Sequence, residues 1–334
     1  MLANILRVIL GLAVVAALAI AGILATTFDW PWLPALAVGL ITPLLGHAAL
    51  LGSEFLVTAW LGRHATLPAD AYRLDLGSRT RAWLTEVPTA IRIFCLQMPW
   101  TGHRSLSSAD NSALKSAASD RGRLPVVLIH GYFCNRALFT ELAMHLAARG
   151  HAVESVNLEP VFGSIDQYPP IIDQAVQKAR CATGGDQVAL IGHSMGGIAA
   201  RAYLRDYGDE AIAQVITLGS PHRGTQLARI GHTEIVRQLS PSNPWLLALF
   251  KQEPLARYRL FTVIIAEHDN IVTPQCSQTL PGAKTLSVRG LGHVDLARHP
   301  AIFKLIDQAL DEAKAQAAGT GLRNTAEITC EGPT

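Results

Sequence analysis

The chain has 334 residues, which is enough for one large domain or two modest ones. Hydrophobic residues make up 49% of it and charged residues only 16%. Because soluble chains carry about 25% charged residues, part of this one is expected to lie in lipid. The formal net charge of +2 and the lack of a basic stripe with interleaved aromatic residues argue against a nucleic-acid-binding protein.

Two long apolar stretches open the chain. Residues 5–25 are apolar apart from Arg7, and a helix needs roughly 20 such residues to cross a bilayer. Residues 33–60 are less uniform, because three residues interrupt them: Pro43, His47 and Glu54. The joining segment "TTFDWPW" is turn-like, and its tryptophans favour a membrane–water boundary. We therefore expect a membrane anchor over residues 1–62, made of two transmembrane helices joined by a short hairpin.

Two alternatives stay open for these stretches. A cleaved signal peptide would make the protein periplasmic or secreted, although residues 8–24 are long for its apolar core and no small-x-small cleavage site precedes "TTFDW". The second stretch is also compatible with a buried or interfacial helix. Lysine and arginine are absent from the hairpin loop and present beyond both spans, so the positive-inside rule places both ends in the cytoplasm.

Residues 63–120 are expected to form an amphipathic segment followed by a linker. Apolar residues recur at helical spacing in residues 79–100 between flanking arginines. Such a helix can lie on anionic lipid or pack on the next domain, and the sequence leaves both open. Residues 105–123 are polar and rich in small residues, as linkers are. The tail, residues 316–334, is expected to be frayed.

The cysteines show neither a CxxC pair nor zinc-like spacing. There are five: Cys95, Cys134, Cys181, Cys276 and Cys330. Their odd number leaves at least one unpaired within a single chain, and free, mostly buried thiols in a reducing compartment are the simplest interpretation. A Cys181–Cys276 disulfide is the alternative.

From Leu124 onward, strand-like apolar runs alternate with helical patterns. Strands are expected over residues 125–131, 151–158, 187–194, 211–221, 258–269 and 284–290. Helices are expected over residues 136–150, 171–182, 196–208 and 300–315. This alternation predicts an α/β domain over residues 121–315, with a mostly parallel sheet covered by helices on both faces.

Ser194 stands at one strand-to-helix junction, in "LIGHSMGGIAARAY". A serine in such a tight turn needs small residues two positions before and after it, and Gly192 and Gly196 stand there. This is the G-x-S-x-G nucleophile elbow in its expected setting. A serine that only caps the helix between packing glycines is the alternative.

A serine nucleophile needs a base, and the base needs a group that orients it. His293 follows the last expected strand, and Asp269 follows the strand before it. The order Ser194, Asp269, His293 is the order of the Ser-Asp-His triad in this kind of fold. Glu267 is the alternative acid.

Two backbone amides are expected to stabilise the oxyanion that forms during acyl transfer. One is the N–H of Met195, which follows the nucleophile. The other comes from the loop after the first strand, where the N–H of Tyr132 is the candidate and that of Phe133 the runner-up.

With these motifs in place, residues 124–314 resemble the α/β-hydrolases, and among them the bacterial lipases and esterases of the triacylglycerol lipase type. The resemblance rests on "IHGYF", "GHSMGG", "TLGSPHRGT", "DNIVTP" and "GLGH". In such relatives the segment like "GSPHRGT" leads into a lid, which implies a lid over residues 226–257. The resemblance also implies acyl-binding side chains, which we expect to be Phe133, Trp245, Leu246 and Phe250. An ordinary packing face for residues 245–250 stays equally open.

The resemblance implies a serine ester hydrolase acting on lipid or other acyl esters. With the apolar stretches and the positive-inside rule, this predicts an enzyme of the bacterial inner membrane with its catalytic domain in the cytoplasm. The resemblance implies no cofactor, no metal and no obligate protein partner. An acyltransferase or thioesterase with the same triad is the alternative. A non-catalytic membrane-tethered interaction domain is a third possibility.

Overall fold

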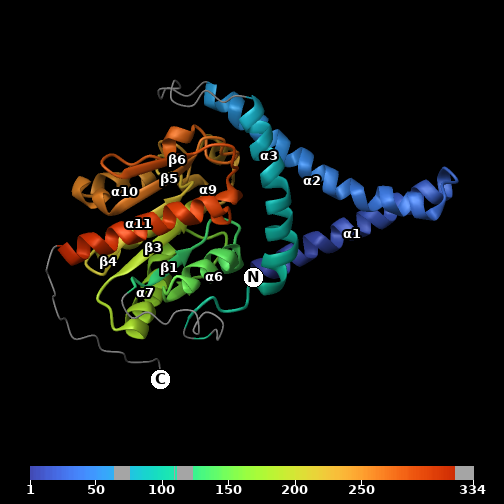
Figure 1. The fold of residues 1–334 in the computed structure, drawn as a ribbon. Coiled ribbons are helices and arrows are strands. Elements are labelled where there is room, and N and C mark those ends of the chain that lie inside the picture. Colours follow the sequence, from blue (N-terminus) through green and yellow to red (C-terminus); the bar gives the residue numbers. More distant parts are fainter. Residues whose placement is uncertain (64–75, 109, 111–122, 320–334) are drawn as a thin grey trace.

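One parallel sheet organises the C-terminal body of the protein. The computed structural model describes residues 1–63, 76–108, 110 and 123–319. In this part of the chain, six strands pair in the order β2-β1-β3-β4-β5-β6 (Figure 1). The strands are β1 (Val126–Ile129), β2 (Val153–Ser155), β3 (Val188–His193), β4 (Ile212–Leu218), β5 (Phe261–Ala266) and β6 (Lys284–Val288). The expected α/β class and parallel sheet are confirmed.

Helices cover both faces of the sheet, as parallel crossovers require. Alternate residues of β1 enter two separate cores: Val126 and Leu128 lie in one, Val127 and Ile129 in the other. The first core is closed by α6 (Thr140–Ala148) and α11 (Pro300–Gly319), and the second by α7 (Pro169–Thr183) and α8 (Met195–Tyr207). Several bounds differ from expectation: the strands are mostly shorter than expected, residues 258–260 belong to a 3₁₀ turn instead of a strand, and α11 runs to Gly319.

The strand order reverses between β1 and β3. From β1 the chain crosses outward to β2, and from β3 it proceeds the other way through β4, β5 and β6. The loops at the carboxyl ends of β1 and β3 therefore diverge and leave a crevice at this switch point. The segment after β1 begins at His130, and the residue after β3 is Ser194.

Short helices fill the connections between the larger elements. They are η3 (Arg136–Phe139), η4 (Ile165–Gln167), η5 (Gln226–Ile230), α9 (Glu234–Gln238), α10 (Pro244–Gln252), η6 (Leu255–Leu260), η7 (Gln275–Gln278) and η8 (Val294–Ala297).

Two long helices, α1 (Leu2–Thr27) and α2 (Trp32–Arg63), project from the body as a hairpin (Figure 1). Both are long and apolar enough to cross a membrane, and only 11% and 17% of their most apolar windows are buried. Their side chains therefore face outward, unlike those of a core helix. The two helices touch through small residues: a Cβ added at Gly39 would lie 2.3 Å from the carbonyl oxygen of Ala17. Close approach at small residues is how helices pack in lipid.

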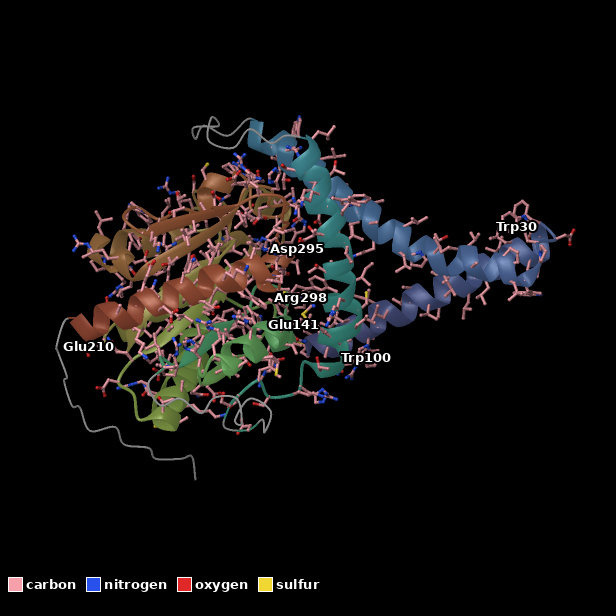
Figure 2. The ribbon with its side chains drawn as sticks, viewed as in Figure 1. Trp30, Trp100, Glu141, Glu210, Asp295 and Arg298 are labelled. Atoms are coloured by element: carbon pink, nitrogen blue, oxygen red, sulfur yellow. The ribbon has the colours of Figure 1, made fainter. Side chains whose placement is uncertain are left out.

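The base of the hairpin is built into the body. Leu2 and Leu6 of α1 lie in the same core as Ile93 and Met98. The Arg7 guanidinium lies 5.2 Å from the centre of the Trp100 ring. Trp100 therefore marks the base of the hairpin, while Trp30 lies at its tip (Figure 2).

A helical layer crosses between the hairpin and the body. It comprises α3 (Leu76–Ala90), the π-helix η2 (Ile91–Gln97) and α4 (Met98–Thr101). Trp83 donates to the carbonyl oxygen of Ala48 on α2 at 2.9 Å. On another side of α3, Ala82, Glu86 and Ala90 are buried. Leu84 and Leu96 stay exposed, so the layer packs on the body and keeps an outward apolar face.

The thiols differ from expectation in one respect. Cys95, Cys134 and Cys276 are free, whereas Cys181 is disulfide-bonded. The Cys181–Cys276 alternative is therefore wrong.

A buried ion pair secures α8, the helix that follows Ser194. Arg201 and Glu253 have fully buried side chains, and Arg201 Nε donates to Glu253 Oε1 at 2.9 Å. Arg201 also donates to the carbonyl oxygen of His222, and the Tyr258 hydroxyl donates to Glu253. The pair thus joins α8 to two segments beyond β4.

Replacing Glu253 by glutamine is expected to cost about 3–5 kcal/mol in the free energy of unfolding, because Arg201 stays buried without its charge partner. Urea unfolding in a mild detergent measures the loss. Glu312→Gln is the control, since Glu312 pairs with Lys284 at the surface. Equal losses in the two variants would contradict the prediction.

Candidate active site

Ser194 occupies a strained turn between β3 and α8. Its backbone has φ 55° and ψ −126°, a conformation that residues with a Cβ disfavour. The turn is possible because a Cβ at Gly196 would lie 2.1 Å from the carbonyl oxygen of Ile129. Ser194 precedes the first residue of α8, yet its side chain makes no capping hydrogen bond. The hydroxyl is therefore not used to cap the helix.

His293 and Asp269 form a hydrogen-bonded pair. The distance between His293 Nδ1 and Asp269 Oδ2 is 2.9 Å, and both side chains are buried. Asp269 Oδ1 accepts the N–H groups of Ile271 and Val272 at 2.8 and 2.7 Å. The carboxylate is thus held by its own loop, with the second oxygen facing the imidazole.

The serine and the pair meet at Gly219, the residue after β4. The N–H of Ser194 donates to the carbonyl oxygen of Leu218 at 2.8 Å. A Cβ added at Gly219 would lie 3.1 Å from Asp269 Oδ2 and 3.2 Å from His293 Nδ1. Ser194, Asp269 and His293, which follow β3, β5 and β6, therefore lie around Gly219 at the carboxyl edge of the sheet. Glu267, the alternative acid, pairs instead with Arg289 at 2.6 Å.

Two further histidines line the back of the turn. His193 Nε2 lies 2.9 Å from the carbonyl oxygen of His293. Burial, and then the nearby charge of His293, lower the pKa of His193 to about 3. Burial also lowers the pKa of His130 to about 4. Both rings are therefore neutral near pH 7 and serve as packing and hydrogen-bonding groups.

The loop after β1 lies over Ser194. A Cβ added at Gly131 would lie 2.9 Å from Ser194 Cβ, and Phe133 has a positive φ of 53°. Met195, the other oxyanion candidate, is the buried first residue of α8. Tyr132, Phe133 and Phe162 form an aromatic cluster with ring centres 6.2–6.4 Å apart. Phe162 is 43% exposed, so this cluster offers apolar surface beside the serine.

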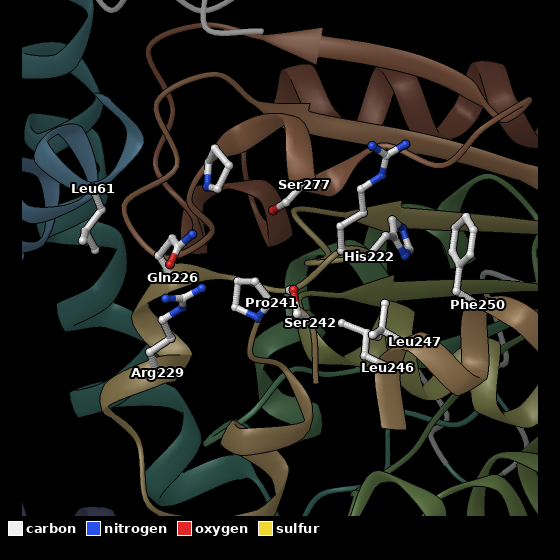
Figure 3. A pocket seen from close by; sticks show the side chains of 13 residues that line it. Leu61, His222, Gln226, Arg229, Pro241, Ser242, Leu246, Leu247, Phe250 and Ser277 are labelled. Atoms are coloured by element: carbon white, nitrogen blue, oxygen red, sulfur yellow. The ribbon is translucent and has the colours of Figure 1, made fainter. Parts of the chain in front are cut away.

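The remaining acyl-binding candidates lie on α10. Leu246 and Phe250 line a cavity of about 720 Å³ that reaches Leu61 at the end of α2 (Figure 3). Trp245 does not line it and donates from Nε1 to Asp166 at 2.7 Å. Ser194 and His293 are not among the lining residues either. This cavity is therefore separate from the serine.

Three polar residues beside the pair were not expected from the sequence. Glu86 accepts the N–H groups of Val294 and Asp295, and Asn270 accepts that of His293. Glu54 of α2 in turn accepts from the Asn270 side chain at 2.8 Å. In the sequence, the one signal for Glu86 and Glu54 is that each is an isolated acidic residue in a segment with helically spaced apolar residues. No group of three or more metal-binding side chains occurs in the described ranges.

Comparisons with known proteins agree with the fold and the motifs. Residues 125–256 match the family described as alpha/beta hydrolase fold. A mature lipase of Bacillus licheniformis superposes with a TM-score of 0.52 at 18% identity, covering 57% of this chain and 93% of that one. The expected α/β-hydrolase fold is thereby confirmed.

Two curated relatives are named triacylglycerol lipases. The chain is 31% identical over 166 residues to a triacylglycerol lipase of Burkholderia plantarii, covering 47% of this chain and 43% of the relative. It is 35% identical over 115 residues to one of Pseudarthrobacter phenanthrenivorans, covering 32% and 35%. The chain thus spans less than half the length of these relatives. The resemblance to the lipase and esterase branch is supported.

The lowered pKa of His193 predicts a pH dependence of stability. Its folded-state pKa of about 3 lies below the ordinary 6.5, so the unfolded chain binds the proton first as pH falls. Stability is therefore expected to decline from about pH 6.5 toward pH 3, and His193→Asn should make that decline shallower. Chemical unfolding in detergent at pH 7 and pH 5 measures the slope. The exposed His103→Asn is the control, and equal flattening in both variants would refute the assignment.

Proposed function

We propose that this protein is a serine ester hydrolase that cleaves carboxylic esters of lipid-like substrates. The observation that carries the proposal is the buried His293–Asp269 hydrogen bond of 2.9 Å, gathered with the strained Ser194 at the sheet edge. A serine near a histidine that a carboxylate orients supports acyl transfer through a serine nucleophile.

In the proposed reaction, Ser194 Oγ attacks the ester carbonyl carbon while His293 takes its proton. Asp269 holds Nδ1 of the imidazole, which leaves Nε2 as the base and stabilises the cation that forms. The N–H groups of Tyr132 and Met195 donate to the oxyanion. His293 then protonates the departing alcohol, which leaves an acyl-serine ester. Water, deprotonated by His293, attacks this ester. The bond between the acyl carbon and Ser194 Oγ then breaks, His293 returns the proton to Oγ, and the acid leaves.

A lipid-like substrate is favoured by the apolar surroundings. The cluster of Tyr132, Phe133 and Phe162 lies beside the serine, and the curated relatives are triacylglycerol lipases. Burying an acyl chain against such a surface removes apolar area from water at about 25 cal/mol per Å².

The first proposed test is hydrolysis of p-nitrophenyl esters, from acetate to palmitate, by detergent-purified protein. Ser194→Ala is expected to lose at least about 1000-fold in kcat, because the nucleophile is gone. Labelling of Ser194 by a fluorophosphonate should disappear with it. Activity that survives in Ser194→Ala would contradict the assignment, and product formation with an added alcohol acceptor would favour an acyltransferase.

We also propose that α1 and α2 anchor the protein in the bacterial inner membrane, with the C-terminal body in the cytoplasm. Their exposed apolar surface supports the anchor, as do Trp30 at the hairpin tip and Trp100 at its base. The orientation rests on the positive-inside rule, because lysine and arginine are absent from the hairpin tip and present beyond both spans. Packing of Leu2 and Leu6 in the core of the body favours a retained helix over a cleaved signal peptide.

Carbonate-washed membranes from a bacterial host are expected to retain the protein with α1 intact, as judged by its mass. A fluorescent protein that matures only in the cytoplasm, fused after residue 334, should fluoresce. A shortened, soluble product would instead indicate a signal peptide, and a dark fusion would place the body on the opposite side.

A further inference from the structure

The loop that carries His293 is held by side chains at four consecutive backbone N–H groups. Each finds a carboxylate or amide oxygen within 3.3 Å. The pairs are Gly292 with Asp295 Oδ2, His293 with Asn270 Oδ1, Val294 with Glu86 Oε1, and Asp295 with Glu86 Oε2. The orientation of the imidazole therefore depends on where these acceptors lie.

Glu86 supplies two of the four acceptors from outside the hydrolase body. Its side chain is fully buried on α3, and its distances to the N–H groups of Val294 and Asp295 are 2.8 and 3.0 Å. A Cβ added at Gly292 would lie 2.5 Å from Glu86 Oε2, so the carboxyl group packs directly against the backbone of the loop. Burial, and then the charge of Asp295, raise the pKa of Glu86 well above its ordinary value. A buried carboxyl group is costly, and these two hydrogen bonds offset part of that cost.

Three further contacts tie the same loops to the N-terminal helices. The Thr89 hydroxyl of α3 donates to Asp295 Oδ1 at 2.7 Å, in the space between α3 and the body (Figure 2). Glu54 of α2 accepts from the Asn270 amide at 2.8 Å, and Asn270 follows Asp269 in the chain. The Thr273 hydroxyl donates to the carbonyl oxygen of Thr58 at 3.1 Å. Both loops, the one with the base and the one with the acid, thus rest on α2 and α3.

We propose that Glu86 and Glu54 are positioning residues for the His293–Asp269 pair, so that the N-terminal helices form part of the active-site scaffold. The matched hydrolase family covers residues 125–256 and therefore contains neither residue. The inference rests on the proposed ester hydrolysis. Neither glutamate touches substrate; each acts by fixing a loop.

The test is steady-state kinetics and fluorophosphonate labelling of Glu86→Gln and Glu86→Ala in the full-length protein. Glutamine keeps one acceptor oxygen but turns an NH₂ group toward the second N–H donor. Both variants are expected to lose roughly 10- to 100-fold in kcat and in labelling rate, with KM within about twofold, because a displaced imidazole misaligns the base and leaves substrate binding intact. Glu312→Gln, a surface carboxyl on α11, is the control.

Glu54 offers an internal comparison. Glu54→Gln retains an oxygen that can accept from Asn270, whereas Glu54→Leu has none. We expect Glu54→Leu to lose more kcat than Glu54→Gln at similar thermal stability. Equal kcat values for the two variants would overturn the role of Glu54.

A readout without turnover separates this inference from the proposed activity. The Nδ1 proton of His293, hydrogen-bonded to Asp269, should give a low-field NMR signal that broadens or shifts in Glu86→Gln but not in Glu312→Gln. Wild-type kcat and an unchanged signal in Glu86→Gln would overturn the inference even if Ser194→Ala is inactive. If the wild-type protein hydrolyses no ester, the proposed function fails, and the NMR signal alone decides the positioning role.

Discussion

The backbone of Ser194 is the constraint on which the site depends. A positive φ at a residue with a Cβ costs about 1–3 kcal/mol and persists only where surrounding structure enforces it. Three features enforce it here. Gly196 lets α8 approach the carbonyl of Ile129, the N–H of Ser194 bonds to Leu218, and the Arg201–Glu253 pair secures α8 from behind. The central strands and the buried ion pair thus keep one hydroxyl at the sheet edge.

The order of the strands in the sheet brings the other site residues next to Ser194. Parallel strands bring their carboxyl ends to one edge, so residues that follow β3, β5 and β6 meet there although they are far apart in sequence. The reversal between β1 and β3 opens the crevice into which the Tyr132–Phe133 loop extends. Neutral His130 and His193 pack behind it, so neither adds a positive charge beside His293.

Much of this could be read from the sequence, because the relevant signals are local. The runs of apolar residues predicted all six strands. The motifs around Ser194, Asp269 and His293 each follow a predicted strand, so local sequence was enough to select these three residues. The edges of elements were less accurate: Tyr258 and Leu260 resemble the start of a strand, but residues 258–260 close a 3₁₀ turn. The support from Glu86 and Glu54 was not predictable. Their partners lie about 200 residues away, and a single acid on an apolar helix has no local pattern that names its partner.

The packing of Leu2 and Leu6 also has a consequence for biosynthesis. Leu2 and Leu6 lie some way before Ile93 and Met98 in the chain, yet they share a core with them, and that layer packs in turn on residues further along the chain. The hairpin is therefore synthesised before the body against which its base packs. Contacts between such distant segments form slowly, since a long loop must close before they stabilise anything. Assembly is thus expected to finish with the docking of the hairpin base onto a body that is made after the hairpin.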